Sequence, residues 1–149
     1  MKVAKGSFLM PLTSDQDLRI LLQNTATIAV VGYSDNPMKA SHSVALSLKR
    51  AGYDVYFVNP TLESNDQRVV YPSVAAIPVP IDVVDIFRRP ENVPPVVEDA
   101  IQAGAKAIWM QLGIVNEEAA QRAETANLTV VMNRCLIVEH RRLQPVRTP

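Results

Sequence analysis

Cysteine is nearly absent from this sequence, and so are other features on which common kinds of site depend. The 149 residues contain one cysteine and two histidines, so no internal disulfide can form and a structural zinc site is not expected. Fifteen basic side chains balance fifteen acidic ones, so no overall positive field favours nucleic acid or an acidic membrane surface. No apolar run reaches the roughly 20 residues that span a bilayer. We therefore expect a cytoplasmic protein with no metal, nucleic-acid or membrane partner.

Apolar residues, by contrast, make up 48% of the chain, and segments typical of strands alternate with segments of helical period. Short apolar, often β-branched runs predict strands over 25–31, 53–58, 69–71, 81–87, 107–110 and 128–132. Periodic segments with capping residues predict a helix after Thr13 or Ser14, a helical turn over 73–77, and helices over 41–52, 94–103, 116–125 and 134–143. This alternation predicts a single Rossmann-like domain over 14–143, a three-layer α/β/α arrangement with a mostly parallel sheet. We expect residues 1–13 to form a tail or arm and 144–149 a C-terminal tail.

In an open parallel sheet, ligands bind outside the carboxyl ends of the strands. The most informative turn at that edge follows the first strand, where Gly32 ends a β-branched run and has no Cβ to hinder a close approach. The turn leads to a helix N-terminus, which favours a phosphate. Ser34 and Ser41 carry hydroxyl donors and Lys39 carries a positive charge. An ordinary strand-to-helix connection with capping serines is the alternative interpretation.

A dinucleotide site is disfavoured by the same turn. The GxGxxG fingerprint requires glycines where this chain has Ser34 and Pro37. Asn59 ends the second strand, where NAD-binding folds often carry an acidic residue for the ribose. A P-loop is excluded because no Gly-Lys-Ser/Thr triplet exists.

Six sequence blocks, in order over about residues 15–143, resemble the small stand-alone CoA-binding proteins. These proteins are similar to the CoA-binding domain of the succinyl-CoA synthetase alpha subunit. The blocks are Val30 to Pro37 with Lys39 and Ser41, Val58 to Pro60, Tyr71 to Ser73, Asp85 to Arg88, Trp109 to Gly113, and Asn133 to Cys135 with Glu139 and His140. The chain departs from the family pattern at Asn133, where aspartate is usual, at His42, where an aromatic residue is common, and over 66–70, which lacks a glycine.

The resemblance implies that coenzyme A lies across the strand ends. Its phosphates would meet the turn from Gly32 to Ser41, its adenosine end would lie along Asn59 and Pro60, and its pantetheine would pass Gln111 and Gly113. The full set of implied cofactor-binding residues is Gly32, Tyr33, Ser34, Asp35, Pro37, Lys39, Ser41, Asn59, Pro60, Phe87, Arg88, Gln111 and Gly113.

No catalytic residue is assigned, because the two histidines offer no triad in their sequence contexts. Trp109 lies inside a predicted strand and is assigned to the core, while Cys135 beside Arg134 is either a reactive thiol or a small buried residue. We expect a protein that binds CoA or an acyl-CoA without catalysis. The alternatives are a CoA-transfer or ligase component that needs a partner chain, an NAD(H)-binding regulatory module, a thiol-dependent enzyme, and a protein-binding module. A protein partner or a homo-oligomer also stays open.

Overall fold

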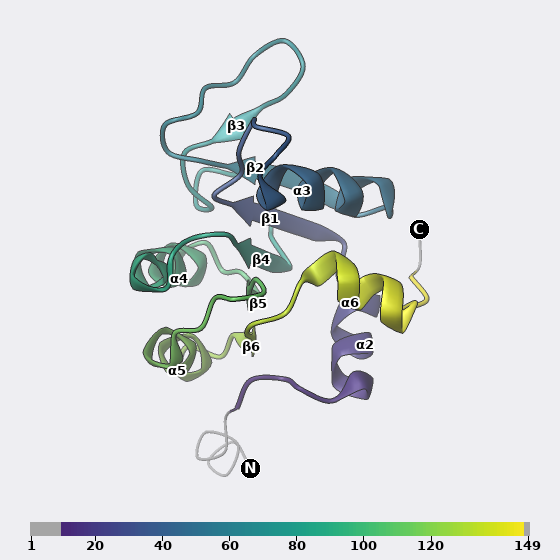
Figure 1. The fold of residues 1–149 in the computed structure, drawn as a ribbon. Helices are drawn as coiled ribbons and strands as arrows, with labels where there is room; N and C mark the ends of the chain where they lie inside the picture. Colours follow the sequence, from purple (N-terminus) through teal and green to yellow (C-terminus); the bar gives the residue numbers. More distant parts are fainter. Residues whose placement is uncertain (1–9, 148–149) are drawn as a thin grey trace.

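Six parallel strands form one sheet in the computed structural model, which describes residues 10–147 (Figure 1). The strands are β1 (Thr27–Val31), β2 (Asp54–Val58), β3 (Val70–Tyr71), β4 (Val83–Ile86), β5 (Ala107–Met110) and β6 (Thr129–Val131). Their order across the sheet is β3-β2-β1-β4-β5-β6. The strand order therefore reverses beside β1, between β1 and β4, where open parallel sheets bind their ligands. This arrangement confirms the predicted Rossmann-like α/β fold.

Helices cover both faces of the sheet (Figure 1). The helices are α2 (Asp15–Gln23), α3 (Ala40–Arg50), α4 (Val93–Gln102) after the 3-10 turn η1 (Pro90–Asn92), α5 (Glu117–Thr125) and α6 (Leu136–Leu143). Helices α4 and α5 pack on one face, and α2, α3 and α6 pack on the other. Every residue of β4 and β5 is buried, as expected for strands covered on both sides.

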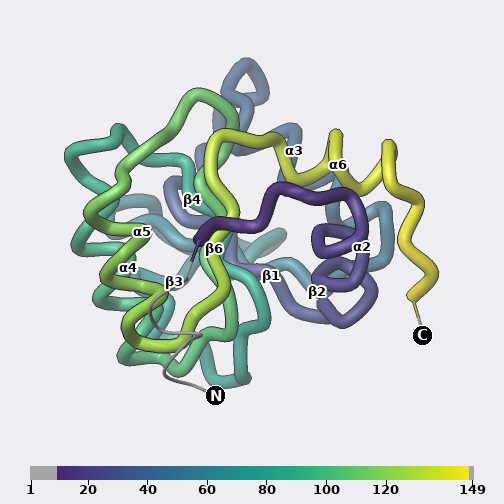
Figure 2. Tube along the Cα trace, turned by 90° about the horizontal axis from the view of Figure 1, so that it is seen from below, coloured from purple at the N-terminus to yellow at the C-terminus, as the bar shows by residue number. Residues whose placement is uncertain are grey.

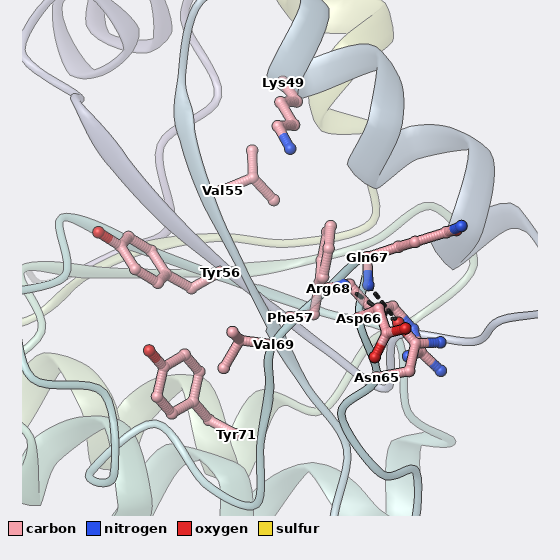
Figure 3. Close-up of a pocket in the computed structure, with 10 residues that line it drawn as sticks. All are labelled: Lys49, Val55, Tyr56, Phe57, Asn65, Asp66, Gln67, Arg68, Val69 and Tyr71. Carbon is pink, nitrogen blue, oxygen red and sulfur yellow. Dashed lines mark hydrogen bonds between the residues drawn. The ribbon is translucent and has the colours of Figure 1, made fainter.

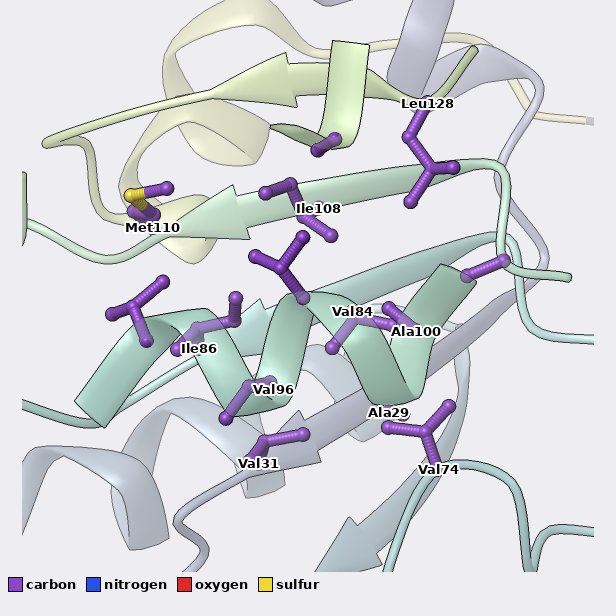
Figure 4. Packing of buried hydrophobic residues seen from close by; sticks show 14 of the residues in the cluster. Ala29, Val31, Val74, Val84, Ile86, Val96, Ala100, Ile108, Met110 and Leu128 are labelled. Carbon is purple, nitrogen blue, oxygen red and sulfur yellow. The ribbon is translucent and has the colours of Figure 1, made fainter. Parts of the chain in front are cut away.

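The core lies in two layers that the sheet separates. Figure 4 shows the layer under α4, where Val84 and Ile86 of β4 meet Val96 and Ala100 of the helix. The opposite layer contains Trp109, whose indole is fully buried and donates a hydrogen bond to the carbonyl of Arg134 at 2.8 Å. The assignment of Trp109 to the core is therefore confirmed.

Local signals place the helix ends well. The Ser14 hydroxyl accepts a hydrogen bond from the Asp17 N–H at 3.1 Å and caps α2. Asn116 caps α5 in the same way, through the Ala119 N–H. Asn127 has φ 71°, the left-handed conformation expected after α5.

The segment over 73–77 forms a single turn, in keeping with its prediction, because the Ala76 N–H donates to the Ser73 carbonyl at 3.3 Å and the Ile77 N–H to the Val74 carbonyl at 3.0 Å. The Asp99 carboxylate of α4 caps this turn by accepting hydrogen bonds from the Val74 and Ala75 N–H groups at 2.7 and 3.1 Å. The last helix begins at Leu136, two residues later than predicted, with Cys135 as its N-cap.

Both ends of the described chain contact the domain. Figure 2 shows the segment before α2 passing beside β6, where the Leu12 N–H donates to the Val130 carbonyl at 2.8 Å. Arg147 donates to the Thr25 carbonyl and stacks 3.8 Å from the Tyr53 ring centroid. The predicted arm falls largely on residues 1–9, which lie outside the described residues. Within residues 10–147, no helix has the length and apolar character needed to cross a membrane.

Candidate functional site

Gly32 brings the end of β1 against the end of β4. Its φ is +88°, and a Cβ placed on it would lie 2.2 Å from the carbonyl oxygen of Phe87. The Gly32 and Tyr33 N–H groups both donate to the Val58 carbonyl, at 3.0 and 3.2 Å. The close approach that the sequence predicted at Gly32 is therefore an approach of backbone to backbone, and it draws the loops after β1, β2 and β4 together.

A cavity of about 440 Å³ lies beside this glycine. It is lined by Gly32, Ser34, Lys39, Ala40, Ser41, Phe87, Arg88, Arg89 and Ile114. Six of the residues proposed from the sequence thus meet around one cavity. Three cationic side chains and no carboxylate line it. Among the described residues, Lys39, Arg88 and Arg89 have no ion-pair partner, so their charge is available to an anion.

The N-terminus of α3 faces the same cavity through Ala40 and Ser41. Its N-cap is Lys39, which makes no side-chain capping hydrogen bond. Within residues 10–147, the Ala40 and Ser41 N–H groups also have no hydrogen-bond partner. Free N–H groups at the first turn of a helix suit a phosphate, because the helix dipole adds to their partial positive charge.

Tyr33 and Asn59 of the predicted site act within the protein. The Tyr33 side chain is 2% exposed and stacks on Phe57 with ring centroids 4.2 Å apart. Asn59 donates through Nδ2 to the Tyr33 carbonyl at 2.9 Å and accepts through Oδ1 from the N–H groups of Thr61 and Leu62. Tyr33 thus fixes the turn after β1 against β2, and Asn59 connects the loop after β2 to the same turn.

Gln111 and Gly113 connect the loop after β5 to the segment after β6. Gln111 is buried, and its Oε1 accepts the Leu136 N–H at the start of α6. The Gly113 N–H donates to Oδ1 of Asn133 at 2.7 Å. The remaining predicted residues, Asp35, Pro37 and Pro60, are exposed on their turns and do not line the cavity.

Arg68 and Asp85 are ionisable residues inside the fold that were not predicted as functional. Arg68, from a loop that looks merely polar in the sequence, has a side chain that is 10% exposed and an ion pair with Asp35 at 3.1 Å. Asp85 is fully buried in β4, and neither carboxylate oxygen has a hydrogen-bond partner among the described residues. Burial raises the pKa of Asp85 well above its ordinary value. In the sequence, Asp85 could have been noticed as a carboxylate between Val84 and Ile86 in a predicted strand.

The other reactive side chains do not assemble into a catalytic group within the described residues. His42 Nδ1 lies 3.0 Å from the Ser34 carbonyl, whereas His140 Nδ1 lies 2.8 Å from the Tyr53 hydroxyl. Cys135 is a half-buried free thiol. In residues 10–147, no group of three potential metal ligands is found.

Comparison with known proteins gives a consistent set of relatives. The family model described as "CoA binding domain" matches residues 26–141. An uncharacterized protein of Bacillus subtilis strain 168, YneT, is 39% identical over 127 residues, which are 85% of this chain and 94% of that protein. A solved structure of a hypothetical protein from Pyrococcus horikoshii OT3 superposes with a TM-score of 0.85 at 42% identity, over 91% of this chain and 96% of that one.

A larger enzyme also matches. The acetate–CoA ligase [ADP-forming] II of Archaeoglobus fulgidus is 30% identical over 110 residues. These residues are 72% of this chain but only 16% of the ligase. The similarity is thus confined to a small part of that enzyme.

Proposed function

This chain belongs to the CoA-binding domain family, and we propose on that premise that it binds coenzyme A or an acyl-CoA in the cavity beside Gly32. The observation that carries the proposal is the charge of this cavity. Lys39, Arg88 and Arg89 line it without a carboxylate, and the unpartnered N–H groups of α3 open onto it. Coenzyme A carries a pyrophosphate and a ribose phosphate, so such a site matches the most highly charged part of the ligand.

The proposed orientation follows the strand order. The pyrophosphate lies at the N-terminus of α3, where Ser34 and Ser41 add hydroxyl donors and Lys39 adds charge. The adenosine end lies toward the loop after β2, because nucleotides extend across the carboxyl ends of the strands from the switch point. The pantetheine leaves toward the loop after β5, from which Ile114 lines the cavity.

We also propose that the chain binds its ligand without catalysing a reaction alone. The histidines support this proposal, since His42 and His140 hydrogen-bond within the fold and lie outside the lining of the cavity. The match to 16% of an acetate–CoA ligase favours a second candidate, a CoA-binding component that works with a partner chain. Both candidates predict that the purified protein alone forms no ADP from CoA, acetate and ATP, and ADP formation under these conditions would refute both. Adding the protein to a cell extract from which it is absent separates the two, because only the second candidate predicts that CoA- and acetate-dependent ADP formation rises.

The binding proposal is tested by isothermal titration of the full chain with CoA, and with NAD, NADP and ATP as competitors for the same kind of site. We expect saturable binding of CoA and weaker binding of the other three. An absence of CoA binding at millimolar ligand would refute the proposal.

Lys39→Ala tests the position of the phosphates. Because Lys39 is exposed, we expect a loss of about two- to fivefold in CoA affinity at low salt, and a smaller loss at high salt because ions screen the contact. Arg50→Ala is the matched control, since it removes a positive charge from the last turn of the same helix, at an exposed position. Equal losses in the two variants would show a general charge effect and would place the phosphates elsewhere.

A further inference from the structure

Arg68 is a buried arginine with donors that the protein does not use. It comes from the loop between β2 and β3, and its side chain is 10% exposed. Nη2 pairs with Oδ2 of Asp35 at 3.1 Å, but Nε and Nη1 are buried without a hydrogen-bond partner among the described residues. Arginine does not lose its proton in proteins. Buried donors of this kind need an explanation, and a ligand that supplies acceptors is one.

The guanidinium lies where the loops after β1 and β2 meet. Asp35 belongs to the turn after β1, which also supplies Gly32 and Ser34 to the cavity. Burial raises the pKa of the Tyr33 hydroxyl; the Asp35 carboxylate raises it further and the Arg68 guanidinium opposes the rise, so the three groups are neighbours. Arg68 is thus close to the proposed ligand but outside the cavity that holds the pyrophosphate.

A second cavity of about 370 Å³ opens at Arg68, on the outer edge of β2 (Figure 3). The loop residues Asn65 to Arg68 gather at one side of it, and Tyr56 and Tyr71 lie at the other. The cavity exists because β3 pairs only with Phe57 and Val58 and leaves the first half of β2 without a neighbour on that side. Open space therefore adjoins Arg68, while its Nε and Nη1 atoms are covered from solvent in the free protein.

In dinucleotide-binding folds with this strand order, the adenosine ribose lies beyond the end of the second strand, and an arginine nearby accommodates the ribose 2′-phosphate of NADP. The ribose of coenzyme A carries a 3′-phosphate, which dephospho-CoA lacks. We propose that Arg68 binds this 3′-phosphate and thereby distinguishes CoA from dephospho-CoA. The inference rests on the proposed function, because it names the group that recognises one end of the same ligand.

In the free protein, the Asp35 carboxylate pairs with Arg68 at the position that we propose for the phosphate. That carboxylate is 55% exposed and engages one nitrogen of the guanidinium, so water can replace the contact at little cost. A phosphate offers three oxygens and can accept from two guanidinium N–H groups at once. Binding therefore exchanges one anion for a better one and leaves the buried cation paired in both states.

The experiment compares CoA and dephospho-CoA by isothermal titration of the full chain and of Arg68→Gln. We expect the wild-type protein to prefer CoA by about tenfold to a hundredfold, the range for hydrogen bonds to a charged group. Arg68→Gln should abolish the preference and leave the affinity for dephospho-CoA within about threefold. Arg141→Gln, which removes the same charge from the exposed face of α6, is the control and should keep the preference.

Asp35→Asn supplies a second test that does not depend on a buried substitution. It frees the guanidinium, so the preference for CoA should increase. If wild type binds both ligands equally, if Arg68→Gln weakens both equally, or if Asp35→Asn leaves the preference unchanged, the assignment of Arg68 is wrong and the proposed function stands. If wild type binds neither ligand, both proposals fail.

Discussion

Replacing Gly32 with alanine tests the backbone contact on which the candidate site is built. At φ +88°, an L side chain adds about 1–2 kcal/mol of local strain. The new Cβ would also lie 2.2 Å from the Phe87 carbonyl oxygen, and that backbone is fixed by the Phe87 N–H bond to Val31. Relief needs a shift of β1 against β4, for which we add about 1–3 kcal/mol by analogy with overpacked cores. We expect Gly32→Ala to lower the free energy of unfolding by about 2–5 kcal/mol.

Gly113→Ala measures the backbone strain at positive φ without the steric contact that Gly32→Ala makes with Phe87. Gly113 has the same φ, +88°, but a Cβ there meets nothing within 4 Å, so we expect the strain alone, about 1–2 kcal/mol. Urea unfolding can be followed through Trp109, which is the single tryptophan and is fully buried. Equal losses of stability in the two variants would refute the reasoning, because the contact with Phe87 would then contribute nothing.

Two further predictions concern stability. Burial raises the pKa of Asp85 well above its ordinary value of 3.8, so above that pH the native state keeps a proton that the unfolded chain releases. The free energy of unfolding should fall with rising pH by up to about 1.4 kcal/mol per unit until the native carboxyl ionises. Asp85→Asn should remove that fall in a series of urea titrations, and an unchanged slope would contradict it. Ser14→Ala removes the acceptor of the Asp17 N–H and should cost about 1 kcal/mol, seen as a lower Tm; an unaltered Tm would mean that water replaces the cap.

The layers of the fold could be predicted because each element carries its own signal. Strands buried on both faces are apolar apart from Asp85 of β4, and caps such as Ser14 and Asn116 mark where helices begin. The cap of the turn over 73–77 could not be predicted. Its first N–H groups, those of Val74 and Ala75, are satisfied by Asp99, 25 residues from Val74, and no local pattern reports an acceptor at that distance.

Only part of the candidate site could be predicted, because the sequence does not show contacts between distant segments. Topology places the loops at one edge, so Gly32, Lys39 and Arg88 could be grouped from the sequence. Topology does not say which polar side chains point at a ligand and which hold a loop. Asn59 and Gln111 turned out to hold loops, and Arg68 is buried although its neighbours in the sequence are exposed. Such differences depend on contacts between loops, which only the folded chain defines.

Polar side chains at the carboxyl edge of the sheet have two different roles. Amide side chains cross-link the loops: Asn59 joins the loop after β2 to that after β1, and Asn133 joins the loop after β6 to that after β5. Cationic side chains at the cavity, Lys39, Arg88 and Arg89, are left without ion pairs among residues 10–147. Cross-linked loops lose little freedom when a ligand arrives, so less of the binding energy is spent on ordering the protein. Loops cross-linked by neutral amides, beside cationic side chains without ion pairs, are the arrangement expected if the site proposed for an anionic ligand is formed before binding.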